Sequence, residues 1–539
     1  MIPATMIGGA MIDGAMIGGA TIGGKILSTV GLSGLIPAQF QTLPQTADYI
    51  RILPEIVLSI FGMIVMLLDP LIDEKKGQKT LASIALIGAL SGLGATWFMA
   101  QSPGLAFWNM VQVDGFSVFF HVLVIAIAAV VILSSYEYLA VQRIRAGEYY
   151  ALILFGTVGM GLMSSAVELV LIFIALEISS ISTYVLAGFR RHEASSTESS
   201  LKYFLLGSFA TAFFLYGVAL MFGATGHTNI NEISAALHAG GVPLLAVVGV
   251  ALMFVGLGFK VAAAPFHIWT PDVYEGAPAP IVGFMSTAPK AAAFAVLLRI
   301  VFVIDVHALF WVIWVAAALS MTLGNIGALV QHNVKRLLAY SSIAHAGYLL
   351  VGFAAAPGLG TSAAMFYACS YAAMNLGAFA VVSHFANAGE RYITLEDYEG
   401  LGRSSPLLAA SLTVFLLSLI GIPITGGFFA KFYVFSAAMR SHLIWLTIIG
   451  VLNSGVGAYY YLRLIVRMYM SEGRREIPAT PVAFAPRVAI AVCLAATLYL
   501  GLLPNTVLQF TQGSAEQLVN RPVPALPSSA PVPNTPAVL

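Results

Sequence analysis

Four ionisable side chains stand inside long apolar runs of this sequence. They are Glu177 in LIFIALEISSIS, Lys260 in GFKVAAAPFHIW, Lys290 in MSTAPKAAAFAVLL and Lys431 in GIPITGGFFAKFYVF. A charge at the centre of a bilayer costs at least about 2.5 kcal/mol, and such residues usually mark ion or proton pathways. Because a single acid cannot neutralise three lysines, the set indicates proton or ion transfer rather than internal pairing.

Lysine is suited to carrying a proton in such a place. Burial lowers the pKa of a lysine ammonium toward neutrality, so that the group loses and regains its proton in operation. A carboxylate about 7 Å away couples to that charge by about 2.4 kcal/mol at an effective dielectric constant of about 20. We therefore expect Glu177 to lie near Lys260 and to control its proton.

Proline interrupts the segment that carries Lys260. His267 follows this lysine by seven residues, and Pro265 stands between them. Because proline removes a backbone hydrogen bond, we expect a broken helix at about residues 262–268. Broken membrane helices occur where they face protein interior or water, as at the sites of ion-coupled transporters.

A second break is expected at about residues 422–428, where Pro423 precedes Lys431. Interrupted segments in equivalent positions of two halves indicate an internal repeat, which is often inverted. Independent proline kinks without symmetry are the alternative.

Three other polar residues are weaker candidates for the same path. Lys202, in SLKYFLLGSFATAFFLYG, reaches the interior or anchors a helix end. His345, in YSSIAHAGYLLVGF, is a neutral hydrogen-bonded histidine or a relay. Lys335, in NVKRLLAYSS, is a cytoplasmic flank charge or the start of a water wire. The residue pattern leaves these alternatives open.

The elements that position these residues must be membrane helices. Of the 539 residues, 59% are apolar and 9% are charged, which excludes a soluble globular protein. A spanning helix needs about 20 mainly apolar residues. We find fourteen such runs, centred near residues 60, 90, 125, 158, 179, 212, 255, 291, 320, 347, 374, 418, 456 and 495. The sequence therefore predicts an all-α polytopic membrane protein of about 14 transmembrane helices.

Basic residues gather in alternate loops between these runs. One set of loops carries fifteen lysines and arginines, whereas the other carries only Arg440. The positive-inside rule makes the first set cytoplasmic and places both termini on the non-cytoplasmic side. This orientation agrees with an even number of spans.

The two ends of the chain differ in composition from the middle. Residues 1–48 form a leader and linker that begins with repeated MIGGA-like units and lacks the basic region of a signal peptide. Residues 509–539 are proline-rich, and we expect them to be extended and mobile outside the membrane. The transmembrane domain is expected at residues 49–508.

No motif for a cofactor or a metal is present. The sequence has no CxxC, no P-loop, no dinucleotide-binding GxGxxG and no histidine pair placed to ligate haem. The net charge of +1 gives no sign of nucleic-acid binding. We expect no cofactor in this chain, so a partner must supply the energy for transport.

Five long motifs carry a resemblance to a known family. They are GFKVAAAPFHIWTPDVYEGAPAPIVGFMSTAPKAAAF, NVKRLLAYSSIAHAGYLLVGF, IALEISSISTYVLAGFRR, SLKYFLLGSFATAFFLYG and GIPITGGFFAKFYVF. They resemble subunit N of bacterial proton-pumping NADH:quinone oxidoreductase, respiratory complex I, whose mitochondrial counterpart is subunit 2. The resemblance covers about residues 50–505.

The resemblance implies an antiporter-like fold of fourteen helices. Two inverted five-helix repeats, at about residues 149–303 and 308–470, each contain one discontinuous helix. By motif, the resemblance makes four residues the principal proton relay: Glu177, Lys260, Lys290 and Lys431. Four others are accessory to it: Lys202, His267, His345 and Lys335.

The resemblance also implies a role within a larger enzyme. The chain would be a subunit of a translocase in the cell inner (plasma) membrane, without redox chemistry of its own. NADH, FMN, iron–sulfur clusters and quinone would belong to partner subunits. The partners would be membrane-arm subunits resembling L, M, K, J, A and H, through them the peripheral arm, and membrane lipid, with no nucleic acid. A multisubunit cation/proton antiporter, the photosynthetic form of the complex and a passive scaffold are the alternatives.

Overall fold

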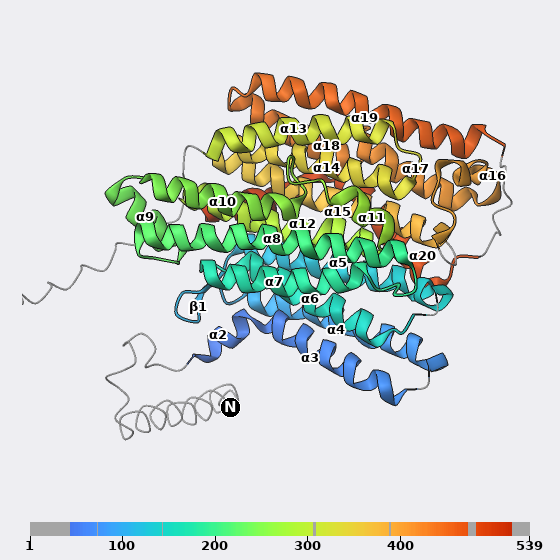
Figure 1. Cartoon of the computed structure of the whole chain (residues 1–539), viewed down its shortest axis with the longest axis horizontal. Helices are drawn as coiled ribbons and strands as arrows, with labels where there is room; N and C mark the ends of the chain where they lie inside the picture. The colour runs from blue at the N-terminus through green and yellow to red at the C-terminus, as the bar shows by residue number, and fades with distance from the viewer. Residues whose placement is uncertain are drawn as a thin grey trace, which may run out of the picture.

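Helices make up nearly all of the described chain (Figure 1). The computed structural model describes residues 44–72, 74–142, 144–304, 309–386, 390–472 and 481–519. The strands in this part are short: β1 (Gly104–Ala106) pairs antiparallel with β2 (Val111–Val113), with Leu105 opposite Gln112.

The helices follow one another with short connections. In the first half they are α2 (Thr46–Arg51), α3 (Leu53–Leu68), α4 (Glu74–Ala100), α5 (Gly115–Gln142), α6 (Gly147–Ser165), α7 (Leu169–Ala187), α8 (Ala194–Thr225), α9 (Ile230–Gly240), α10 (Leu244–Val261), α11 (Thr270–Gly276) and α12 (Ala279–Arg299). In the second half they are α13 (Leu309–Leu329), α14 (Val334–Ala354), α15 (Pro357–Ala386), α16 (Leu401–Ser404), α17 (Pro406–Ile420), α18 (Gly426–Arg440), α19 (Ile444–Met470), α20 (Phe484–Leu502) and α21 (Pro504–Val519).

Eleven of the described helices are long and apolar enough to cross a membrane. The chain is therefore a multi-pass membrane protein, as its composition predicts. Each of the fourteen predicted centres falls within a helix, although α6, α17 and α19 are not among these eleven. The number of spans stays a prediction.

The helices lie side by side, and the last two, α20 and α21, pack back against α5 and α15. Figure 1 places α3 and α4 at the lower edge and α19 at the upper edge. The most enclosed of these eleven helices are α12, α14 and α15. In their most apolar stretches, 100%, 94% and 94% of the residues are buried. These three helices form the core of the bundle, and three of the predicted site residues, Lys290, Lys335 and His345, lie on them.

Both predicted helix breaks are confirmed. The first lies between α10, which ends at Val261, and α11, which begins at Thr270. The second lies between Ile420 of α17 and Gly426 of α18. At the second break Gly421 has φ 95°, a left-handed conformation that ends a helix and that glycine adopts without strain.

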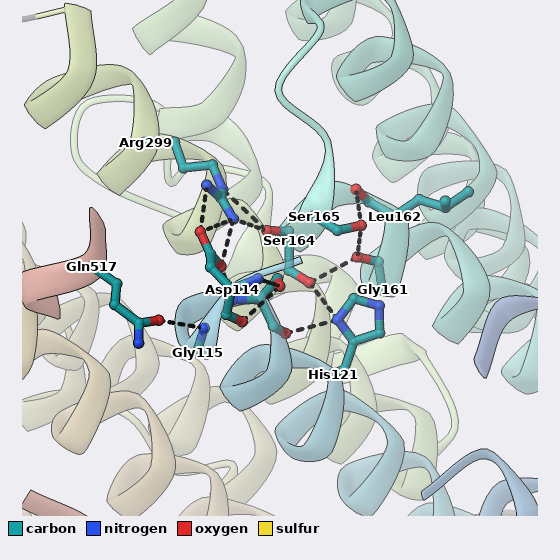
Figure 2. Close-up of polar contacts among 10 residues, drawn as sticks. Asp114, Gly115, His121, Gly161, Leu162, Ser164, Ser165, Arg299 and Gln517 are labelled. Atoms are coloured by element: carbon teal, nitrogen blue, oxygen red, sulfur yellow. Dashed lines mark hydrogen bonds and ion pairs between the residues drawn. The ribbon is translucent and has the colours of Figure 1, made fainter. Parts of the chain in front are cut away.

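A buried ion pair joins the end of α12 to the start of α5 (Figure 2). Arg299 contacts Asp114 at 3.2 Å, and the two side chains are 1% and 8% exposed. The same guanidinium donates two hydrogen bonds, at 3.1 and 3.0 Å, to the carbonyl of Ser164 at the end of α6. These contacts set the register of α12 against α5 and α6.

His121 extends this network to α3. Its Nδ1 lies 2.7 Å from the carbonyl of Ser117 and 3.0 Å from Oγ of Ser164, as Figure 2 shows for the Ser164 contact. Its Nε2 lies 2.7 Å from Oε1 of Glu55. His121 is therefore a hydrogen-bonded core residue that holds the first helices against the centre of the bundle.

The expected ends of the chain need one correction. Residues 1–43 and 520–539, which hold most of the expected leader and tail, lie outside the described residues. Residues 509–519, which we assigned to the extended tail, are helical and belong to α21. Gln517 accepts a hydrogen bond from the backbone N–H of Gly115 at 2.8 Å, an amide in the first turn of α5 without an intrahelical partner.

The Asp114–Arg299 pair generates a first prediction. Arg299→Met removes the cation beside the buried carboxylate of Asp114, and we expect a loss of about 3–5 kcal/mol in the free energy of unfolding. Thermal unfolding of the purified protein measures it. The control is Arg191→Met, because Arg191 pairs with Glu148 while 71% exposed and should matter little. Equal effects of the two changes would contradict the prediction.

Candidate proton-transfer site

Lys260 is buried near the end of α10, 3% exposed. Its Nζ donates a hydrogen bond of 3.0 Å to Oγ of Ser180 on α7. The rings of Tyr184 and Tyr203 lie 5.9 and 5.8 Å from Nζ, within the range of a cation–π contact. In the described part of the chain this ammonium has no ion pair within 4.0 Å, so neutral groups alone hold it.

Glu177 lies on α7, one turn before Ser180, and is half-buried. Its charge acts on Lys260, but no hydrogen bond joins the two side chains. Oε1 of Glu177 is buried without a hydrogen-bond partner among the described residues. The two side chains thus interact through their charges but do not form a hydrogen-bonded pair.

Lys290 lies on the fully buried helix α12 and is 3% exposed. Its Nζ contacts both the hydroxyl and the carbonyl of Ser342 on α14, at 2.5 and 3.2 Å. Tyr371 of α15 donates to the same hydroxyl at 2.8 Å. Hydrogen bonds therefore join this lysine to Ser342 and Ser342 to Tyr371.

His345 lines the same small cavity as Lys290, Ser342 and Tyr371. Its Nδ1 is 2.7 Å from the hydroxyl of Tyr367, and its Nε2 is 3.4 Å from that of Tyr461. The ring is 2% exposed. The structure thus places His345 among buried polar side chains and not at the surface of the bundle.

The second helix break positions Lys431 of α18. Its Nζ donates to the carbonyls of Leu419 and Ile420 at 3.0 and 2.8 Å, and to Oγ of Ser454 on α19 at 2.8 Å. These two carbonyls end α17, and a helix end attracts a cation. The ring of Tyr348 lies 4.9 Å from Nζ. The break thus supplies ligands that a continuous helix would keep for itself.

At the first helix break, the backbone carbonyls that the break frees have different partners. The carbonyl of Phe259 accepts a hydrogen bond of 3.1 Å from Nε1 of Trp269, so it is not available to Lys260. His267 is half-buried within the break, next to the exposed Ile268, and its Nδ1 has no hydrogen-bond partner among the described residues. His267 therefore lies closer to the outside of the bundle than the three principal lysines.

The two remaining predicted residues have opposite surroundings. Lys202 is 43% exposed and pairs with Glu198 and Asp272, at 2.7 and 2.9 Å, in a cavity of about 310 Å³ at the bundle end. Lys335 is fully buried and contacts Glu390 at 2.5 Å. The structure thus does not bring Lys202 into the buried group, and Lys335 is not an exposed flank charge.

Two residues of this site, Ser342 and Glu390, are absent from the sequence prediction. Ser342 follows Lys335 by seven residues on α14, and residues at this spacing share a helix face, so helical periodicity was a usable signal. Glu390 lies in a connection between helices and has no such signal. Its role depends entirely on the segments that fold against it.

Comparisons with known proteins agree with this fold and show the family of the chain. The profile of the family described as NADH:quinone oxidoreductase/Mrp antiporter, TM, matches residues 166–457. NADH-quinone oxidoreductase subunit N 2 of Koribacter versatilis is 65% identical over 491 residues, covering 89% of this chain and 100% of the relative. This chain belongs to the NADH-quinone oxidoreductase subunit N family. The resemblance seen in the sequence is therefore confirmed.

Solved structures show how widely the fold of this family is shared. A chain of respiratory complex I from Thermus thermophilus is 37% identical, with a TM-score of 0.73, and the match covers 86% of this chain and 100% of that chain. A chain of the Mrp complex from Dietzia is 20% identical, with a TM-score of 0.76, and covers 88% and 98%. The second likeness concerns the fold alone.

The Lys290 site generates a second prediction. Ser342→Ala removes the hydroxyl that binds both Lys290 and Tyr371, and hydrogen bonds to charged groups contribute about 1.5–3 kcal/mol. We expect a loss of that size in the thermal stability of the subunit within the purified complex. Ser411→Ala is the control, because the exposed hydroxyl of Ser411 bonds only its own helix. No difference between the two variants would show that Ser342 does not hold the lysine.

Proposed function

We propose that this chain moves protons across the membrane through Glu177, Lys260, Lys290 and Lys431, as a membrane-arm subunit of proton-pumping NADH:quinone oxidoreductase. The observation that carries the proposal is the binding of Lys260, Lys290 and Lys431 by serine hydroxyls and not by carboxylates. A hydroxyl both donates and accepts hydrogen bonds, so it can bind the ammonium and the neutral amine. A carboxylate would instead favour the ammonium alone.

Hydroxyl and imidazole groups connect two of these lysines. From Lys290 the path runs through Ser342 and Tyr371 to His345, and the ring of Tyr348 lies against Lys431. A histidine accepts a proton at one nitrogen and releases one from the other, so it passes protons between two sides. These side chains support proton transfer from lysine to lysine within the buried core.

The Glu177–Lys260 pair provides the point at which the path is controlled. Opposite charges stabilise one another when close, and separating or neutralising them favours release of the lysine proton. Quinone reduction in partner subunits would change this balance, and those partners would hold NADH, FMN, iron–sulfur clusters and quinone. In this proposal the chain takes a proton from the cytoplasmic side and releases it outside, and Lys202, His267, His345 and Lys335 have accessory roles.

The setting follows from the same proposal. The chain lies in the cell inner membrane with both termini on the non-cytoplasmic side, next to other membrane-arm subunits. The antiporter-like domain begins at about residue 49 and extends through α21 to Val519, with inverted repeats at about residues 149–303 and 308–470. Two broken helices, each with a lysine beside its break, support the repeats.

The third prediction tests the relay at Lys260. Lys260→Met keeps the apolar stem and removes the exchangeable proton, and Lys260→Arg keeps a charge that cannot be lost. We expect both complexes to assemble, with proton transport through this subunit reduced at least about tenfold, as for loss of a proton-transfer group. NADH:quinone turnover and proton uptake in reconstituted vesicles measure this.

The matched control is Lys79→Met, because Lys79 is exposed on α4. It should assemble and pump as the unmodified complex does. Full pumping in both Lys260 variants would refute the relay. Failure of Lys260→Met to assemble, together with normal pumping by Lys260→Arg, would indicate a structural charge.

A further inference from the structure

A fully buried acid lies at one end of the bundle, outside the relay described above. Glu390, in the segment after α15, has a side chain that is 2% exposed. Its Oε1 accepts hydrogen bonds of 2.7 Å from the hydroxyl of Tyr138 and from the backbone N–H of Ala279. Its Oε2 lies 2.5 Å from Nζ of Lys335 and 3.3 Å from Arg190. We call Tyr138, Arg190, Lys335 and Glu390 the Glu390 cluster.

The charges of this cluster single out one group that can exchange a proton. Burial by itself would raise the pKa of Glu390, but Lys335 and Arg190 hold its pKa below the ordinary value, so it stays ionised. Arg190 cannot lose its proton at ordinary pH. The two cations share one acid, and of the two only Lys335 can release a proton and regain it.

The Glu390 cluster lies next to one wall of a polar cavity. Arg190 donates to the carbonyl of Gly276 at 3.1 Å, and Lys335 donates to that of Ala277 at 2.7 Å. Gly276 lines the cavity of about 310 Å³, whose other walls carry charged groups such as Lys202 and Asp272. This is the end of the bundle where the basic loops predict the cytoplasm.

Polar groups continue from the Glu390 cluster toward the core. Lys335 and Ser342 lie two turns apart on one face of α14, about 10.5 Å along the helix, and Ser342 binds Lys290. The buried hydroxyl of Tyr274 lies near Ser342 and makes no hydrogen bond within the described part of the chain. Such buried polar atoms are usually satisfied by ordered water. The cluster is therefore placed between a surface cavity and a buried lysine.

We propose that the Glu390 cluster is the proton-intake site of this subunit, in which Glu390 is a positioning residue that holds Lys335 between the polar cavity and Lys290. The ammonium of Lys335 gives one proton toward Lys290 and becomes a neutral amine, which then takes one proton from water in the cavity. Glu390 and Arg190 keep their charges throughout. This inference rests on the proposed function and adds the route by which protons reach the core.

The experiment replaces Glu390 by Gln in the intact complex. The amide keeps an acceptor for Tyr138 and Ala279 but removes the negative charge, leaving Glu275 as the acid acting on Lys335 against Arg190. With less negative charge, the lysine holds its proton less strongly. We expect the pH profile of proton uptake, measured in vesicles during quinone reduction, to shift to lower pH by about one unit. The control is Glu399→Gln, since Glu399 pairs with Arg467 at 3.6 Å outside the cluster.

A second variant keeps the inference testable if the first does not assemble. Lys335→Arg preserves the charge and its partner but cannot release a proton, so the complex should assemble with uptake reduced at least about fivefold, about 1 kcal/mol in the barrier. Uptake as in the unmodified complex by Lys335→Arg, or an unshifted profile in assembled Glu390→Gln, overturns the inference. Lys260→Met separates the two proposals: if it blocks uptake while these variants do not, the intake site fails and the relay stands.

Discussion

A lysine ammonium inside a membrane protein must find its hydrogen-bond partners within the protein, and this constraint governs the architecture around the three principal lysines. Lys260 and Lys290 each donate to one serine hydroxyl, and Lys431 to a serine hydroxyl and two helix-end carbonyls. The second helix break exists where those carbonyls are needed. Because the partners are neutral, each lysine can be satisfied with or without its proton, which is the property that a relay requires.

The bundle separates permanent charge from exchangeable charge. At one end Arg299 and Asp114 form a buried ion pair that joins α12 to α5 and α6. At the other end Glu390 binds an arginine and a lysine together. Between them the enclosed helix α12 carries Lys290 without an acidic partner in the described chain. Ion pairs at the two ends of the bundle thus fix the positions of the helices that carry the proposed relay.

Hydroxyl and imidazole groups form hydrogen bonds with one another and with Lys290 in the core. His345 touches tyrosines on two sides, and Ser342 joins Lys290 to Tyr371. None of these groups carries a permanent charge, so none adds the cost of a further buried ion. The proposed intake at Lys335 meets this path on the same face of α14. Helix α14 therefore carries three residues of the proposed route: the intake lysine, the serine that binds Lys290, and the histidine on the way to Lys431.

The sequence by itself determined the membrane class, the four interior charges, both helix breaks and the family. These are local properties: apolar run length, a charge within a run, and prolines such as Pro265 and Pro423 that remove a backbone hydrogen bond. Only the tertiary structure decided that Lys335 is buried while Lys202 is exposed, and that residues 509–519 are helical. It alone revealed Glu390, whose partners Tyr138 and Lys335 lie 252 and 55 residues away in the chain. The helical period places residues on a face, but the neighbour that this face meets is chosen by packing between distant segments.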